Sequence, residues 1–330
     1  METVRACGCK GIRTCLICEK EYNIAKPNGI DELKKAPCYV YCPDCEAVWP
    51  GWEVDELKSH PNHSGNPLAY PDLFRVNEFL EHRCTENFSN DFFNDKNEKR
   101  FIFQNDFLTI DEAENLIKDL DALPWEASQS GRRKQNYGPK CNFKKRRLRT
   151  GDFDGFPVKT KFLQKRFSEH EILKDFQTIE QCSLEYTSKR GASIDPHIDD
   201  CWIWGERIVT VNVIGDSVLT MTKYKGSQKR YNLEDVPTYD PVVKVDSVNS
   251  QLGQLAEVPE NSVVRLPMPA RSLMVLYGSA RYDWEHAVLR EDVDSRRVCI
   301  AYREFTPPYL TDEENNEEAK NTLRKALNFW

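Results

Sequence analysis

The chain has 330 residues, of which 39% are hydrophobic and 30% are charged, and its formal net charge is −7. This composition indicates a soluble globular protein that is long enough for one large domain with an appendage, or for two domains. There is no run of 18 apolar residues and no apolar signal region, so we expect no membrane span and a cytoplasmic and nuclear location. In those compartments the 12 cysteines are expected to be thiols or metal ligands rather than disulfides.

Seven of the cysteines lie within the first 45 residues. The first four follow the pattern C-x-C-x5-C-x2-C around a glycine-rich turn, which predicts a zinc site at Cys7, Cys9, Cys15 and Cys18. A later set has a spacing close to that of a two-Cys, two-His finger and predicts a second zinc site at Cys42, Cys45, His60 and His63. The alternative for both sets is a group of reduced thiols without metal. We assign residues 1–66 to this Cys/His-rich segment and 67–99 to a polar linker.

A short buried strand is expected at residues 101–103, followed by a scaffold helix. Thr109 and Glu112 have the spacing of a capping box, and Pro124 marks the end of the helical pattern. Between them, apolar residues recur at helical spacing: Ala113, Leu116, Ile117 and Leu120.

Residues 130–149 carry nine basic residues and no acidic one, which leaves a charge of −16 on the rest of the chain. Tyr137 and Phe143 are interleaved with these cations, a mixture that suits contact with an acidic polymer or with nucleic-acid bases. We predict that this segment contacts the substrate, with Arg132, Arg133, Lys134 and Tyr137 as the candidate residues. The alternative is a solvated loop.

From residue 180 to 305 the chain reads as short strands separated by turns, with a polar excursion at 223–258. Strands are expected at 181–186, 194–199, 207–214, 217–221, 262–267, 272–277 and 295–303. Many short strands without intervening helices indicate a mainly β protein built as an antiparallel sandwich or jelly roll. Residues 311–330 predict a terminal helix that begins at a Thr311–Glu314 capping box and docks through Leu323, Leu327 and Trp330.

His197 and Asp199 lie two residues apart, so on a strand both side chains point to one face. This triplet arises easily by chance and needs a third ligand. His286 lies 89 residues later, just after a predicted strand, and would complete a two-His, one-carboxylate set. That set holds Fe(II) and leaves coordination positions open. The alternative for His286 is a surface histidine.

The last predicted strand has period two. Val298, Ile300 and Tyr302 fall on one face, and the other face carries Arg297, Cys299, Ala301 and Arg303. Two arginines that flank small residues indicate a pocket with a bound anion, and a dicarboxylate could supply a bidentate partner. A solvent-facing strand is the alternative.

Three patterns together resemble the AlkB branch of the Fe(II)/2-oxoglutarate dioxygenases: His197-x-Asp199, Arg281-x-x-Trp284-x-His286 and Arg297-x5-Arg303. The N-terminal cysteine pattern and the segments 130–140 and 200–207 are also similar to one animal group of that branch. The resemblance implies a double-stranded β-helix at 100–310 with a substrate lid at 130–149. It also implies iron at the three ligands, and 2-oxoglutarate at Arg297 with further contacts from Tyr186 and Arg303.

The chain departs from the family pattern at Leu184 and Cys299, where the family has asparagines. The resemblance implies a monomeric, O₂-dependent oxidative demethylase of methyl-lysine in a protein such as actin. Two alternatives are a demethylase of N6-methyladenine in DNA and a zinc-dependent interaction module without catalysis. The complete set of iron ligands and both arginines speak against the last.

Overall fold

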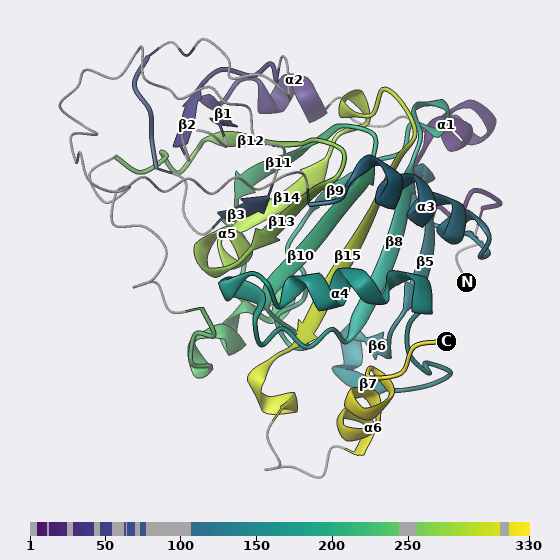
Figure 1. Ribbon diagram of the computed structural model, residues 1–330. Coiled ribbons are helices and arrows are strands. Elements are labelled where there is room, and N and C mark those ends of the chain that lie inside the picture. The colour runs from purple at the N-terminus through teal and green to yellow at the C-terminus, as the bar shows by residue number, and fades with distance from the viewer. Residues whose placement is uncertain are drawn as a thin grey trace.

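The computed structural model describes residues 5–11, 13–24, 29–42, 47–54, 63, 65–69, 73–76, 107–243, 256–310 and 317–330. Two large β-sheets and a few helices form this part of the chain, and the predicted mainly β, jelly-roll class is confirmed (Figure 1). The seven-stranded sheet consists, in order across the sheet, of β3 (Leu73–Val76), β13 (Ser272–Leu276), β10 (Trp204–Ile214), β15 (Arg297–Phe305), β8 (Glu180–Tyr186), β5 (Arg133–Tyr137) and β4 (Glu126–Ala127).

The second sheet has six strands, in the order β2 (Ala47–Pro50), β1 (Cys38–Cys42), β12 (Val263–Met268), β11 (Ser217–Lys223), β14 (Trp284–Val288) and β9 (Ile194–His197). A small hairpin pairs β6 (Lys140–Asn142) with β7 (Arg147–Arg149). The helices are α1 (Leu16–Tyr22), α2 (Gly29–Leu33), α3 (Ile110–Asp121), α4 (Lys161–Phe167), α5 (Gly278–Tyr282) and α6 (Glu317–Lys325). The described part of the chain holds no helix with the length and apolarity of a membrane span.

The two faces of β15 enter different cores, as its period-two pattern predicts. Val298, Ile300 and Tyr302 pack with apolar residues of α3 and α4, which lie in front of the seven-stranded sheet in Figure 1. Cys299 belongs to the other core cluster, which includes residues of both sheets. Arg297 shares the face of Cys299 and is 1% exposed. The sequence pattern therefore places the polar residues of β15 inside the sandwich.

Helix α3 forms as predicted. The Thr109 side chain accepts a hydrogen bond from the Glu112 amide, and the Glu112 carboxylate accepts one from the Thr109 amide, so the capping box is confirmed. Such a cap stabilises a helix by about 1 kcal/mol. Its buried residues are Ala113, Leu116 and Leu120.

The N-terminal third differs from the expected appendage and linker. β1 pairs in parallel with β12, and β3, which falls within the predicted linker, pairs with β13. Both additions give hydrogen-bond partners to strand edges that would otherwise expose unpaired backbone groups. The strand expected at 101–103 lies outside the described residues.

Two further differences concern helices. The five-residue α5 separates β13 from β14, where no helix was expected, and residues 230–238 of the polar excursion form 3₁₀ turns. The terminal helix α6 begins at Glu317, while Thr311 and Glu314 lie outside the described residues. Leu323 packs against the core and the half-exposed Trp330 ring contacts Tyr137, but Leu327 is 66% exposed, so the predicted apolar docking face is wrong at Leu327.

Candidate active site

Two neighbouring strands bring the histidines of the predicted iron site together. β9 and β14 are antiparallel, and His197 stands directly opposite His286, with ring centroids 4.2 Å apart. Asp199 lies two residues beyond the end of β9, and the ligand atoms of all three residues lie within 4.8 Å of one another. Two details differ from expectation: β9 ends at His197, before Asp199, and His286 lies inside a strand rather than after one.

The hydrogen bonds of these residues fit a metal ion. Nδ1 of His197 donates to the Asp195 carbonyl at 2.9 Å, which leaves Nε2 with a lone pair. Oδ2 of Asp199 is buried without a hydrogen-bond partner among the described residues, and it lies 3.9 Å from Nε2 of His286. A buried carboxylate oxygen without a donor is costly, and a bound cation would remove that cost.

The charge states also suit metal binding. Burial, together with the charge of His197, lowers the pKa of His286 to about 3, so the imidazole is neutral at physiological pH. Burial would raise the pKa of Asp199, but the positive charge of Arg303 outweighs it and the pKa is lowered. Neutral imidazoles and an ionised carboxylate are the forms that bind a metal ion.

Arg303 lies against the iron ligands and is already engaged. Its Nε and Nη2 contact Oδ1 of Asp199 at 3.0 and 2.8 Å, and its Nη1 donates to Glu180 at 2.5 Å. Glu180 itself is 9% exposed. This arrangement fixes one oxygen of Asp199 and leaves the other for the metal, so in this structure Arg303 orients a ligand at the metal end of the site.

Arg297 is placed differently, because none of the ion pairs formed by the described residues involves it. Its Nε donates to Oδ1 of Asn212 at 2.8 Å, and its Nη2 lies 3.7 Å from the sulfur of Met268. Nη1 is buried without a hydrogen-bond partner among the described residues. A buried guanidinium with an unused donor is a receptor for a carboxylate. Tyr186 lies opposite Arg297 in the sheet, and its ring is 4.8 Å from the guanidinium carbon.

Asn212 is the residue that sequence reasoning missed. It is fully buried on β10, and its Nδ2 donates to the carbonyls of Gly215, Met268 and Pro269 at 2.8–3.0 Å. These bonds turn its Oδ1 toward Arg297. Asn212 stands across from Cys299, so an amide reaches the site from β10 even though Cys299 replaces the family's asparagine. The available signal was a lone asparagine within a β-branched strand.

The predicted substrate segment is only partly a loop. Residues 133–137 form β5, which pairs with β8 in the seven-stranded sheet, while residues 130–132 precede this strand and the part from residue 138 onward follows it. Arg133 binds the buried Glu185 at 2.6 Å, and Arg132 lies 5.9 Å from the Tyr186 ring. Lys134 is partly buried on β5, and the Tyr137 ring packs on the edge of Trp330. These contacts make Arg133 part of the scaffold, because its charge is already paired.

The four N-terminal cysteines meet as predicted. The Sγ atoms of Cys7, Cys9, Cys15 and Cys18 lie within 4.8 Å of one another. All four are free thiols, and the last three are fully buried. Burial would raise the pKa of Cys18, but hydrogen bonds from Cys7 and Arg5 outweigh it and lower the pKa to about 7. A closed set of four sulfur ligands fits Zn²⁺.

The second predicted zinc site cannot be assembled from the described residues, because Cys45 and His60 lie outside them. Cys42 is buried at the end of β1, and the His63 ring stacks on Trp49 with centroids 4.1 Å apart. This site stays a prediction.

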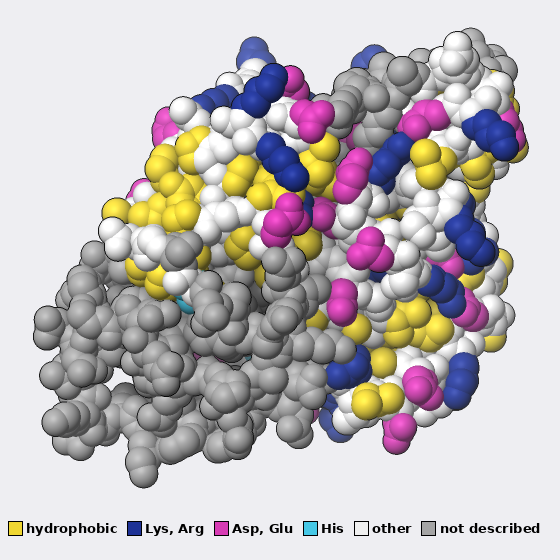
Figure 2. Space-filling model, turned by 90° about the horizontal axis from the view of Figure 1, so that it is seen from above, with side chains coloured by type: hydrophobic (Ala, Val, Ile, Leu, Met, Phe, Trp, Pro, Cys, Tyr) yellow, Lys and Arg dark blue, Asp and Glu magenta, His cyan; other side chains and the backbone are white. Residues whose placement is uncertain are grey.

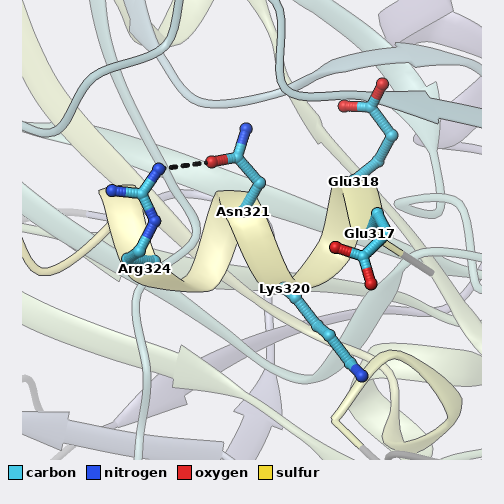
Figure 3. A pocket seen from close by; sticks show the side chains of 5 residues that line it. All are labelled: Glu317, Glu318, Lys320, Asn321 and Arg324. Atoms are coloured by element: carbon cyan, nitrogen blue, oxygen red, sulfur yellow. Dashed lines mark hydrogen bonds between the residues drawn. The ribbon is translucent and has the colours of Figure 1, made fainter. Parts of the chain in front are cut away.

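A surface depression lies elsewhere, along α6. Figure 3 shows its five lining side chains, which all come from this one helix: Glu317, Glu318, Lys320, Asn321 and Arg324. Arg324 donates to Asn321 at 2.7 Å, and the two glutamates lie at the other end of the helix (Figure 3). These side chains do not converge on one point, so the chemistry resides in the metal and arginine site between the sheets.

Comparison with known proteins agrees with this geometry, although no protein-family model matches the chain. Human alpha-ketoglutarate-dependent dioxygenase alkB homolog 4 is 36% identical over 334 residues, which cover 99% of this chain and 95% of the human protein. The mouse protein of the same name is 35% identical over 328 residues, with the same coverage. A DNA N6-methyl adenine demethylase of Caenorhabditis elegans is 28% identical over 316 residues, which cover 95% of this chain and 91% of that protein. The chain therefore belongs to the AlkB family of dioxygenases that depend on alpha-ketoglutarate, the acid also called 2-oxoglutarate.

Proposed function

We propose that this dioxygenase removes N-methyl groups by oxidation. The observation that carries the proposal is a pair of buried polar atoms without partners among the described residues, Oδ2 of Asp199 and Nη1 of Arg297. The first fits Fe(II), held together with His197 and His286. The second fits the distal carboxylate of 2-oxoglutarate.

When bound, iron and 2-oxoglutarate supply the oxidising power for hydroxylation of a C–H bond at the expense of O₂. In the balanced reaction, one oxygen atom enters succinate, which forms with CO₂, and the other enters the methyl group, which leaves as formaldehyde. The residues of the chain orient these reactants. Arg303, which is itself bound by Glu180, holds the carboxylate ligand, and Asn212 holds Arg297.

We propose methyl-lysine in a protein such as actin as the substrate. This is the substrate that the family resemblance implies, and the chain is only 28% identical to the relative that is named a DNA demethylase. Its net charge is −7, and acidic and basic side chains are interspersed over the described part of the face shown in Figure 2. Such a surface disfavours tight non-specific binding to a DNA duplex.

N6-methyladenine in DNA is the second candidate, and two observations favour it. One is the name of the nematode relative. The other is the β6–β7 hairpin, where four exposed cations form no ion pair with any described residue: Lys144, Lys145, Arg147 and Arg149. Phe143 is 45% exposed beside them and could stack on a base.

Succinate release with a methylated actin peptide, methylated single-stranded DNA and their unmethylated counterparts tests both candidates. Stimulation by the peptide alone supports methyl-lysine, and stimulation by the DNA alone supports methyladenine. No stimulation by either methylated substrate would contradict N-demethylation of these two classes. Neutralising Lys144, Lys145, Arg147 and Arg149 should reduce DNA binding and lower the slope of log affinity against log salt by about 0.7 per lost phosphate contact.

For the four N-terminal cysteines we propose a structural Zn²⁺ ion. We also propose a monomeric enzyme that resides in the cytoplasm and nucleus, which immunofluorescence and light scattering would test.

A further inference from the structure

The cysteine cluster packs directly on a segment that leads into the active site. Gly8 lies so close to the backbone of residues 127–128 that a Cβ on it would come within 2.9 Å of those atoms. Gly131 has a φ of +75°, and a Cβ there would lie 2.7 Å from the Arg190 carbonyl and 2.9 Å from the Cβ of Cys15. Neither glycine can be replaced without displacing backbone atoms. The cluster and the segment 127–131 therefore form one packed unit.

From Gly131 a chain of hydrogen bonds reaches the proposed co-substrate site. Nε of Arg190 donates to the Gly131 carbonyl at 2.7 Å, and its Nη2 donates to Glu185 at 2.6 Å. Glu185 is 1% exposed and directly precedes Tyr186 on β8. Arg190 thus links the unit that holds the cysteines to the strand that carries Tyr186.

Glu185 extends this connection to the second co-substrate residue. Its carboxylate also accepts from Nε of Arg296 at 2.9 Å, and Arg296 directly precedes Arg297 on the neighbouring strand. The buried Glu185 carboxylate therefore ties together the two residues that directly precede Tyr186 and Arg297, namely Glu185 itself and Arg296. A displacement of Arg190 would remove one of the cations that compensate this charge.

A second path leads from the cysteines to the iron ligands. The Ser193 amide donates to the Ser130 carbonyl at 3.0 Å, and Nε of Arg13, within the cysteine segment, lies 3.6 Å from the Asp195 carboxylate. The Asp195 carbonyl in turn accepts from Nδ1 of His197. Since Arg13 and Asp195 are about half exposed, this path is the weaker of the two.

Helix α1, which begins after Cys15, contacts the same region of the molecule. Arg290 and Glu19 form a bidentate ion pair at 2.7 and 2.9 Å, and Leu16 packs against Gly191. The cysteine segment therefore contacts the turn at residues 187–195, which joins β8, the strand of Tyr186, to β9, the strand of His197.

We propose that Zn²⁺ in the four-cysteine site holds the segments that carry Tyr186 and Arg297 in position, so that zinc occupancy raises the affinity for 2-oxoglutarate. The inference rests on the zinc site proposed above. Without the ion, the four thiols, three of which are buried, lose the interaction that holds residues 7–18 together. The packing on Gly131 then loosens, and Arg190 no longer holds Glu185 beside Tyr186 and Arg297.

The test uses the full chain loaded with Mn²⁺ at the iron site, so that calorimetry measures 2-oxoglutarate binding without turnover. Cys9→Ser combined with Cys18→Ser removes two zinc ligands, and Cys38→Ser is the matched control because Cys38 lies outside the cluster. Arg190→Gln removes the link and keeps the zinc ligands. Zinc content per chain is measured for every protein.

We expect the double variant to hold one zinc ion fewer per chain than the wild type, because the four-cysteine site is then empty. The dissociation constant for 2-oxoglutarate should rise by about 5- to 20-fold in the double variant, within the usual range of coupling between sites. Arg190→Gln should weaken 2-oxoglutarate binding and retain its zinc, and it keeps the test informative if the double variant does not fold. Affinity for Mn²⁺ should change less than 2-oxoglutarate affinity, because the path to His197 is the weaker one.

Two outcomes would overturn the inference in distinguishable ways. If the double variant and Arg190→Gln both bind 2-oxoglutarate like the wild type while only the first has lost zinc, the site stands and the coupling is wrong. If the wild-type chain contains no zinc, the proposed site is wrong and the coupling falls with it. Linkage supplies a further check, because saturating 2-oxoglutarate should raise zinc affinity by the same factor. An unchanged zinc affinity would also contradict the coupling.

Discussion

The two metal-ligand clusters of this chain differ in donor type, in backbone setting and in closure. The N-terminal cluster gathers four thiols within 12 residues, and three of them are fully buried against the other cysteines. The second cluster combines two histidines from strands that are far apart in sequence with a carboxylate, Asp199, that lies just beyond the first strand. Four sulfur ligands close a coordination sphere, whereas three mixed ligands leave room for co-substrate and O₂. The first arrangement suits a structural metal ion, and the second suits a catalytic metal ion.

The largest effect is expected at the carboxylate of the open cluster. Asp199→Ala removes its only anionic ligand and should reduce succinate release by more than about 100-fold, because metal affinity and orientation are both lost. The thermal unfolding midpoint should also fall, because the buried Arg303 guanidinium loses one of its two carboxylate partners. Asp200→Asn, at the next residue, is the control and should retain activity. Normal turnover by Asp199→Ala would exclude this cluster as the iron site.

The proposed anion receptor, Arg297, should give the next largest effect. Arg297→Ala removes a charge-assisted contact worth about 1.5–3 kcal/mol, so the dissociation constant for 2-oxoglutarate should rise by about 10- to 150-fold. Calorimetry on the Mn²⁺-loaded protein measures this change without turnover. An unchanged constant would remove Arg297 from the co-substrate site.

Asn212 should contribute less, because it acts through Arg297. Asn212→Ala removes one hydrogen bond to the guanidinium, so 2-oxoglutarate binding should weaken by about 5-fold, which corresponds to about 1 kcal/mol. The Michaelis constant for 2-oxoglutarate should rise more than the turnover number falls. In the double variant with Arg297→Ala the two effects should not add, since both act on one contact. Full additivity would mean that Asn212 affects the site by another route.

The smallest effect concerns Glu185, the carboxylate between the two clusters. Burial acts to raise the pKa of Glu185, but hydrogen bonds and charges from Arg133 and Arg190 outweigh it and lower the pKa from 4.5 to about 2. A lowered pKa favours the folded state above the unfolded value, so this stabilisation is present above pH 4.5 and is lost as the pH falls toward 2. Urea unfolding at pH 6 and pH 3.5 should show a loss on the order of 1 kcal/mol that Glu185→Gln reduces. An equal loss in wild type and variant would contradict the assignment.

The spacing of residues within short segments was sufficient to predict many features of this molecule. The capping box at Thr109, the alternation along β15 and the four-cysteine pattern depend on residues close in sequence, and the structure contains each of them. Such features are governed by helical or strand periodicity and by short loops, which the sequence alone specifies. His286 was proposed as the third ligand from its place just after a predicted strand, and the family pattern agreed, but no periodicity links it to His197, which lies 89 residues earlier.

What only the tertiary structure decided was the set of partners around each charge. Arg297 and Arg303 occupy equivalent positions on one face of β15, yet Arg303 is paired with Asp199 and Glu180, whereas Nη1 of Arg297 has no partner among the described residues. The role of Asn212 was likewise hidden, since its partner lies 85 residues away. Strand order brings these groups together. The function of a buried charge depends on its neighbours, because a buried charge has lost its hydration and lies in a medium of low dielectric constant. The gain or loss of one partner there changes the free energy by several kcal/mol.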